Sequence, residues 1–360
     1  MAEAAEVGWF ARRRTAPNPW VGAVVVRDGV IVGTGATEPP GGAHAEIVAL
    51  RAAGEHARGA AMFVTLEPCS HQGRTGPCAD ALIEAGVGRV VVALEDPDAR
   101  IAGQGIERLR AAGVTVDVGV GADRVSHDLA PYLHHRRTGR AFAVVKTATS
   151  LDGRTAAADG SSQWITGPAA RADSHGLRAD AQAVVVGSGT AIADRPTLTA
   201  RDCDPEPERQ PMRVLLDARG RVPATGPLFD PAIAPTLVVT TADAPSAAVD
   251  GWRAAGAKVE AIAPARRDEG GVDLAETLAL LGCEGVLEAL FEGGATVHAS
   301  LLRADLVDRI VAYTGGVVLG SEGLAAFTGP GPATLTDAPR WRLVDAAPLD
   351  GDARLVWEPA

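Results

Sequence analysis

Residues 62–85 read MFVTLEPCSHQGRTGPCADALIEA, and the order of residue types in this stretch predicts a strand, a turn and a helix. The apolar run 62–66 is typical of a buried strand, and residues 78–85 are typical of a helix. Cys69 directly follows the end of the strand, and Cys78 begins the helix. Upstream, His44-Ala45-Glu46 opens a second predicted helix, 44–53, which is expected to end before Gly54.

These residues indicate a metal centre. One imidazole and two thiolates, from His44, Cys69 and Cys78, can fill three corners of a tetrahedral zinc site and leave the fourth for water. The positive end of a helix favours thiolate over thiol, which supports metal binding. Glu46 lies outside this ligand set and can move protons to and from the water. The set is typical of a zinc-dependent base deaminase. His71 lies between the two thiols and is an alternative fourth ligand.

The elements around the motif predict a three-layer α/β/α domain. Asp28-Gly29 separates two apolar runs, 21–26 and 30–33, and is a strong hairpin signal. Strands are expected at 62–66, 89–94 and 114–118, with a further helix at 104–112. Strands that alternate with helices in this way form a sheet covered on both faces.

Near Thr138 the pattern starts again, which predicts a second α/β domain. The sequence predicts boundaries of 1–138 and 142–360 for the two domains, and 360 residues are enough for two cores. The expected strands of the second domain are 143–146, 183–187, 213–216, 237–240, 286–291, 307–313 and 341–344. Its expected helices are 168–181, 275–281 and a segment through 298–302. No Gly-x-Gly-x-x-Gly follows its first strand, so an ordinary dinucleotide-binding fingerprint is absent.

Composition narrows the class of protein. The formal net charge is -11, and no long basic run exists, which argues against a nucleic-acid partner and favours a small-molecule substrate. Cys203 and Cys283 look like isolated thiols, so no disulfide framework is expected. No apolar run is long enough to span a bilayer, and no signal peptide is apparent at the N-terminus. We therefore expect a cytoplasmic protein without a membrane partner.

Taken together, the motifs resemble one family, the bifunctional deaminase/reductase of riboflavin biosynthesis. The resemblance covers nearly the whole chain, and its motifs occur in the order of the family. Its deaminase half is carried by Pro17-Asn18-Pro19-Trp20-Val21-Gly22, His44-Ala45-Glu46 and residues 67–78. Its reductase half is carried by Lys146, Ser150-Leu151-Asp152-Gly153-Arg154-Thr155-Ala156, Ser162-Gln163-Trp164-Ile165-Thr166, Asp194-Arg195-Pro196-Thr197-Leu198-Thr199 and Phe291-Glu292-Gly293-Gly294.

The resemblance implies two successive reactions. First, 2,5-diamino-6-(5-phosphoribosylamino)pyrimidin-4(3H)-one loses its ring 2-amino group as ammonia at a single Zn²⁺. NADPH then reduces the ribosyl side chain of the product to ribityl-phosphate. The implied folds are cytidine-deaminase-like for the first domain and dihydrofolate-reductase-like for the second. The family also implies a homo-oligomer.

The resemblance assigns roles to single residues. His44, Cys69 and Cys78 match the zinc ligands, and Glu46 matches the catalytic proton carrier. The positions that match NADP contacts are Ala148, Trp164, Thr190, Asp194, Gly294, Ala295, Thr296, Val297, His298, Ala299 and Ser300. The positions that match substrate contacts are Asn18, Ser162, Arg178, Leu198, Arg201 and Glu292.

Several of these residues also have plainer interpretations. Asn18 lies between two prolines and is equally a turn former. Arg178 and Arg201 suit a substrate phosphate but are also ordinary surface charges. Trp164 and Leu198 fit core packing. The chain departs from the family in the stretch after the hairpin, where a histidine is usual and Gly35-Ala36-Thr37-Glu38 stands here.

Two competing functions remain open. One is a nucleoside or tRNA deaminase fused to an unrelated domain, against which the acidic charge and the matching second half both argue. The other is a ligand-binding module in which zinc is only a structural cross-link. An exchangeable water on the metal, and a loss of activity in Glu46→Gln, would separate an enzyme from this module.

Overall fold

The computed structural model describes residues 1–70, 76–98, 101–265 and 270–360. Strands and helices alternate along the N-terminal unit of the chain, Met1–Gly139. Its strands are β1 (Gly22–Arg27), β2 (Val30–Ala36), β3 (Ala61–Leu66), β4 (Arg89–Leu94) and β5 (Thr115–Val118). Its helices are α1 (Ala2–Trp9), α2 (Arg12–Thr15), α3 (Ala45–Ala53), η1 (Gly54–Ala57), α4 (Cys78–Glu84), α5 (Gln104–Ala111), α6 (Ala122–Asp128) and α7 (Ala130–Thr138).

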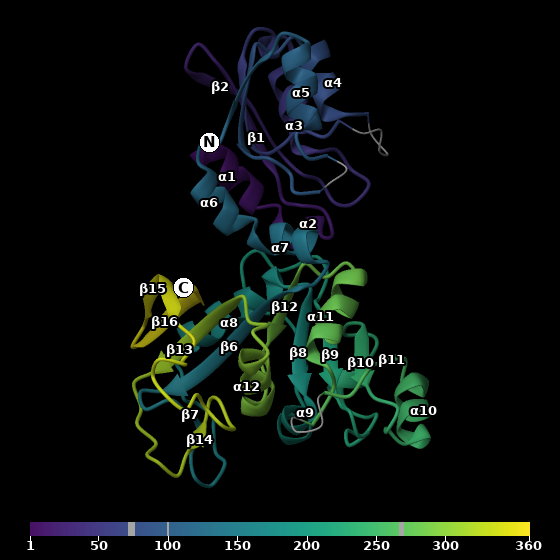
Figure 1. Cartoon of the computed structure of the whole chain (residues 1–360), viewed down its shortest axis with the longest axis vertical. Coiled ribbons are helices and arrows are strands. Elements are labelled where there is room, and N and C mark those ends of the chain that lie inside the picture. The colour runs from purple at the N-terminus through teal and green to yellow at the C-terminus, as the bar shows by residue number, and fades with distance from the viewer. Residues whose placement is uncertain (71–75, 99–100, 266–269) are drawn as a thin grey trace. The chain divides into compact units, whose positions relative to one another are not determined.

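These strands form one sheet in the order β2-β1-β3-β4-β5. The β1–β2 and β1–β3 pairs are antiparallel, whereas β3–β4 and β4–β5 are parallel. The predicted hairpin is confirmed, with Asp28 and Gly29 both at positive φ between β1 and β2. Helices α3, α4 and α5 lie on one face of the sheet, and α1 and α6 lie on the other (Figure 1). The predicted three-layer arrangement is therefore confirmed.

The C-terminal unit, Arg140–Ala360, is built on a larger sheet. Its strands are β6 (Phe142–Ser150), β7 (Arg154–Ala156), β8 (Ala183–Gly187), β9 (Met212–Leu216), β10 (Thr236–Thr240), β11 (Lys258–Ala261), β12 (Glu288–Phe291), β13 (Arg309–Gly315), β14 (Leu324–Ala325), β15 (Trp341–Leu349) and β16 (Asp352–Pro359). Its helices are α8 (Pro168–Asp180), α9 (Ser188–Asp194), η2 (Pro227–Phe229), α10 (Ser246–Ala254), α11 (Leu274–Cys283) and α12 (Ala295–Arg303).

Nine of these strands form the main sheet, in the order β11-β10-β9-β8-β12-β6-β13-β16-β15. Neighbours from β11 to β13 are parallel, so the carboxyl ends of β9, β8 and β12 meet at one edge. The last two strands are antiparallel additions. Strands β7 and β14 pair separately.

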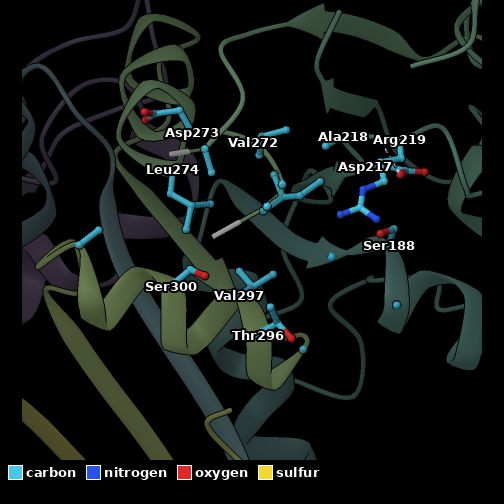
Figure 2. A pocket seen from close by; sticks show the side chains of 18 of the residues that line it. Ser188, Asp217, Ala218, Arg219, Val272, Asp273, Leu274, Thr296, Val297 and Ser300 are labelled. Atoms are coloured by element: carbon cyan, nitrogen blue, oxygen red, sulfur yellow. Dashed lines mark hydrogen bonds between the residues drawn. The ribbon is translucent and has the colours of Figure 1, made fainter. Parts of the chain in front are cut away.

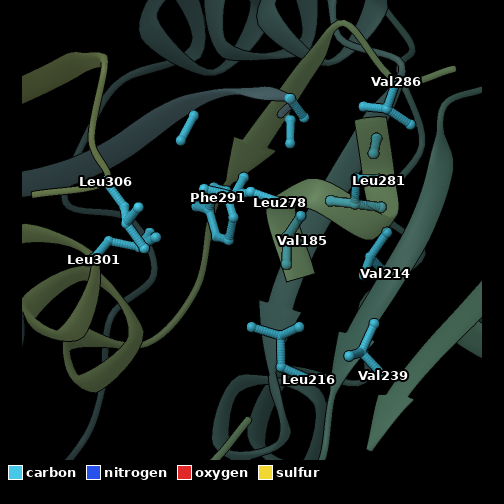
Figure 3. Close-up of a cluster of buried hydrophobic side chains, with 14 of the residues drawn as sticks. Val185, Val214, Leu216, Val239, Leu278, Leu281, Val286, Phe291, Leu301 and Leu306 are labelled. Carbon is cyan, nitrogen blue, oxygen red and sulfur yellow. The ribbon is translucent and has the colours of Figure 1, made fainter. Parts of the chain in front are cut away.

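Both faces of the central strands are buried, which explains their continuous apolar runs. Val185 of β8 points into a cluster with Phe291, Leu278 and Leu281 on one face (Figure 3). Val184 and Val186 join the opposite cluster. Among the described residues, no helix is both long enough and apolar enough to cross a membrane.

Candidate metal centre and nucleotide pocket

Three predicted ligands converge in the N-terminal unit. The ligand atoms of His44, Cys69 and Cys78 all lie within 4.8 Å of one another. The Nδ1 atom of His44 is 3.6 Å from the Cys69 Sγ and 3.3 Å from the Cys78 Sγ. Tetrahedral zinc, with sulfur at about 2.3 Å and nitrogen at about 2.1 Å, holds such atoms roughly 3.5 Å apart. The donor set and its spacing therefore fit Zn²⁺.

Helix starts account for this convergence. His44 is the extended residue that precedes α3, and Cys78 is the first residue of α4. The backbone N–H of Cys78 donates to the Cys69 Sγ over 3.3 Å. A hydrogen bond from the Cys78 thiol is the main reason why the pKa of Cys69 is lowered, to about 4, and the same bond raises the pKa of Cys78. The thiol of Cys69 therefore gives up its proton more readily than an ordinary cysteine, which favours metal binding.

Glu46 lies in the first turn of α3, and only 3% of its surface is exposed. Burial, followed by the negative charge of Cys69, raises the pKa of Glu46 to about 7. Its carboxyl group also interacts with the Cys78 thiol. A carboxyl group that is buried against the ligand set and titrates near neutrality can take up and release a proton there. His71, the alternative fourth ligand, lies outside the described residues.

Glu67, for which the sequence analysis predicts no role, connects the turn that carries Cys69 to α5. Its carboxylate accepts four backbone N–H bonds, from Asp96 (3.2 Å), Gly103 (2.9 Å), Gly105 (2.9 Å) and Ile106 (3.3 Å). The start of α5 also lies close to the backbone of Pro68, since a Cβ on Gly105 would lie only 1.9 Å from the Pro68 carbonyl oxygen. Glu67 therefore sets the position of the turn that carries Cys69.

Thr37 and Asn18 have local structural roles. The Thr37 hydroxyl accepts from the Val21 N–H (3.1 Å) and lies 3.4 Å from the Val21 carbonyl oxygen, and the residue is 4% exposed. Its hydroxyl is thus engaged with the backbone at the start of β1. The Asn18 backbone N–H closes the turn after α2 by donating to the Thr15 carbonyl, 2.8 Å away.

A cavity of about 770 Å³ opens in the C-terminal unit at the carboxyl ends of β8 and β9 (Figure 2). Five residues predicted to contact NADP line it: Thr190, Gly294, Thr296, Val297 and Ser300. A Cβ on Gly293 would lie 2.8 Å from the Thr190 hydroxyl, so α12 and α9 approach closely only because glycine stands there. The sequence analysis missed other lining residues, among them Ser188, Asp217, Arg219, Arg221 and Val272.

The other predicted NADP positions are dispersed and do not belong to the described lining of this cavity. Ala148 is on β6, Asp194 ends α9, and Ala295, His298 and Ala299 are on α12, with His298 and Ala299 buried. Trp164 is 68% exposed before α8, with the Arg171 guanidinium 4.2 Å from its ring centre. Core packing of Trp164 is therefore excluded.

Two predicted substrate residues bind each other. Arg178 donates twice to Glu292, with both bonds 2.6 Å long, and once to the Thr199 carbonyl at 2.9 Å. Burial would raise the pKa of Glu292, but the charge and hydrogen bonds of Arg178 lower it to about 2. Lys146 lies close enough to favour the same negative charge. Arg178 is thus no solvated surface charge.

The remaining substrate candidates lie on exposed or constrained segments. Ser162 is exposed in the segment before α8. Arg201 is exposed and lies 3.7 Å from the Asp202 carboxylate. Leu198 is 2% exposed at φ 55°, which matches its core-packing interpretation.

Each of the two units matches a known protein family. The family model of the RibD C-terminal domain matches residues 141–355, and that of the cytidine and deoxycytidylate deaminase zinc-binding region matches residues 1–94. The riboflavin biosynthesis protein RibD of Chlamydia pneumoniae is 40% identical, over 99% of this chain and 94% of the relative. The chain belongs to the RibD family.

Other members of the RibD family show the same relationship. The Escherichia coli RibD is 38% identical over 99% of this chain and 97% of its own length. The solved structure of Acinetobacter baumannii RibD, form 2, has a TM-score of 0.87 at 36% identity, over 100% and 97% of the two chains. A diaminohydroxyphosphoribosylaminopyrimidine deaminase/5-amino-6-(5-phosphoribosylamino)uracil reductase from Thermotoga maritima has a TM-score of 0.87 at 31% identity, over 100% and 97%.

Membership of the RibD family confirms the predicted activity and fold class. The chain is a bifunctional deaminase and reductase of riboflavin biosynthesis, with a zinc-binding deaminase domain and an NADPH-dependent reductase domain. Its substrates are therefore small molecules.

Proposed function

We propose that the chain converts the diaminopyrimidinone ribosylamine 5′-phosphate into its deaminated, ribityl-phosphate product in two steps. The observation that carries this proposal is the convergence of His44, Cys69 and Cys78 beside the buried carboxyl of Glu46. The reaction named for the Thermotoga maritima relative supplies the substrate. We assign the first step to residues 1–138 and the second to residues 142–360.

In the first step, His44, Cys69 and Cys78 would hold one Zn²⁺, which when bound would lower the pKa of a water molecule toward about 7. Glu46 would carry one proton from the attacking water to the ring nitrogen N3, and would then carry a second proton, from the added hydroxyl group, to the amine that leaves as ammonia. The raised pKa of Glu46 supports this, because a carboxyl that titrates near 7 both accepts and donates at neutral pH. Asn18 donates a hydrogen bond to the substrate.

In the second step, the cavity beside α12 holds NADPH. Thr190 and residues 294–300 contact the cofactor, and free backbone N–H groups at the start of α12 suit its diphosphate. Ala148, Trp164 and Asp194 complete the predicted contacts. The bound NADPH supplies the hydride, and the protein contributes mainly position.

The substrate of the second step is held by Ser162, Arg178, Leu198, Arg201 and Glu292. Because Glu292 fixes the Arg178 guanidinium at two points, this arginine enters the reaction already oriented. Arg201 is exposed and provides a cation for the 5′-phosphate. A cytoplasmic location, a homo-oligomer and the absence of nucleic-acid and membrane partners stay predictions.

The test is to supply the diaminopyrimidinone phosphate with and without NADPH. Ammonia release should need no NADPH, and NADPH oxidation should begin only after deamination. Ammonia release without any reduction would contradict the second step alone. NADPH oxidation that precedes ammonia release would contradict the proposed order.

A further inference from the structure

His175, for which the sequence analysis predicts no role, lies on α8 one turn before Arg178. Residues three positions apart lie on the same face of a helix, so the His175 ring and the Arg178 guanidinium are neighbours. Both contact one acceptor, the Thr199 carbonyl oxygen, which is 3.1 Å from the His175 Nδ1 and 2.9 Å from an Arg178 nitrogen. The two side chains therefore jointly hold the segment that carries Leu198 and Arg201.

The contact with Thr199 fixes the state of the imidazole ring. A carbonyl oxygen only accepts hydrogen bonds, so the proton of the neutral ring is on Nδ1. Burial, followed by the positive charges of Arg178 and Arg201, lowers the pKa of His175 below its usual value of 6.5, so the ring is neutral at pH 7. In this tautomer the Nε2 atom carries a lone pair, and it can accept a hydrogen bond but cannot donate one.

The groups around the ring belong to the predicted substrate site. The charges of Arg178, Arg201 and Glu292 all act on His175. A sugar hydroxyl group both donates and accepts, so a site that binds it needs an acceptor as well as donors. The two arginines can only donate, and both oxygens of Glu292 already accept from Arg178. The Nε2 atom of His175 therefore supplies a neutral acceptor among these residues.

We propose that His175 binds the ribosyl chain of the reductase substrate by accepting a hydrogen bond from one of its hydroxyl groups at Nε2. This inference rests on the proposed function, because it takes Arg178, Arg201 and Glu292 as substrate contacts. A neutral acceptor suits this place, since a second carboxylate would repel the 5′-phosphate of the same molecule. NADPH also carries ribose hydroxyl groups, so the experiment must separate the substrate from the cofactor.

The direct test uses two substitutions, each of which keeps one half of the imidazole ring. His175→Asn places an amide nitrogen near the position of Nδ1, which keeps the bond to Thr199 and removes Nε2. His175→Gln places its amide near the position of Nε2 and loses the bond to Thr199. In His175→Asn we expect KM for the deaminated substrate to rise about three- to tenfold with kcat unchanged, as for the loss of one neutral hydrogen bond made in ground and transition state alike. In His175→Gln this KM should stay closer to the wild-type value.

The cofactor and the bond to Thr199 supply the contrary outcomes. KM for NADPH should be unchanged in both variants, and its rise instead would assign His175 to the cofactor and overturn the inference. A larger rise in KM for the substrate in His175→Gln than in His175→Asn would show that His175 only holds Thr199, and would also overturn it. An unchanged KM for the substrate in both variants would do the same and leave the proposed function intact.

The matched control is Ala172→Asn, at an exposed position of the same helix, which should change neither KM. Thermal unfolding midpoints close to that of the wild type would show that the variants are folded. A wild type that releases ammonia but oxidises no NADPH with the deaminated substrate would contradict the second step of the proposed function, and the inference with it.

Discussion

At the scale of single residues, the proposal assigns the proton transfers of the deaminase reaction to Glu46. Glu46→Gln keeps the shape of the side chain but cannot carry the proton. We expect ammonia release to fall by about 10²- to 10⁴-fold, the usual contribution of general acid–base catalysis. Zinc content should stay at one per chain, because the three ligands are untouched.

Two controls accompany this substitution. Glu55→Gln, at an exposed carboxylate just beyond α3, should leave ammonia release unchanged. Reduction of supplied deaminated substrate should also continue in Glu46→Gln. Full deaminase activity in Glu46→Gln would favour a structural zinc and remove the proton-carrier role.

The Arg178–Glu292 ion pair should make the stability of the reductase unit depend on pH. The pKa of Glu292 is lowered from 4.5 to about 2, so the folded state binds its proton less readily than the unfolded state does. Its contribution to stability is therefore present above pH 4.5 and is lost as pH falls toward 2. A lowering of the Glu292 pKa by this amount corresponds to roughly 3 kcal/mol.

Glu292→Gln should accordingly lower the free energy of unfolding of the reductase unit by about 3 kcal/mol at pH 7. The difference from wild type should shrink between pH 4.5 and 2, as followed by urea unfolding at several pH values. Glu322→Gln, at an exposed carboxylate of the same unit, should show no such change. A difference that stays constant down to pH 2 would contradict the assignment.

Sequence analysis predicts the role of a residue when a local motif carries it, and misses the role when contacts with distant parts of the chain define it. His44, Cys69 and Cys78 were predictable because two helix starts and a strand end bring them together. Glu67 was not, since its four partners lie 29 to 39 residues further along the chain.

At the scale of elements, Glu67 holds the end of β3 against the start of α5. In Glu67→Gln one side-chain oxygen becomes an amide group, which faces backbone donors that it cannot bind. We expect the deaminase unit to lose about 1 to 3 kcal/mol of stability, the cost of unsatisfied buried groups. Zinc should be released more readily to a chromophoric chelator, because the Cys69 turn loosens.

The matched control is Glu107→Gln, an exposed carboxylate on α5 itself. It should leave both zinc release and ammonia release unchanged. Reductase activity should be normal in both variants. If Glu67→Gln retained zinc as firmly as the wild type, the positioning role would be wrong.

Most elements of the fold followed from the sequence pattern, and the exceptions have physical reasons. The Asp28-Gly29 hairpin was predicted, yet the same signal at Asp350-Gly351, where β15 turns into β16, was missed. Strand β16 is partly exposed along most of its length, so its apolar pattern is weak. Strand β11 is similarly exposed at the edge of the sheet. Half-buried strands carry little hydrophobic contrast, which is the signal that sequence analysis uses.

At the scale of the whole molecule, the chain carries two chemistries in two units, Met1–Gly139 and Arg140–Ala360. Each unit has its own sheet and its own candidate site. The candidate metal ligands belong to the first unit, and the cavity proposed to hold NADPH belongs to the second. Loss of one chemistry should therefore leave the other intact.

The most direct test of this account is Cys69→Ser, assayed for zinc and for both half-reactions. We expect zinc and ammonia release to be lost together, because a hydroxyl replaces the thiolate that completes the ligand set. Reduction of supplied deaminated substrate by NADPH should continue at the wild-type rate. Loss of both activities would contradict the account and show that the two sites depend on one another.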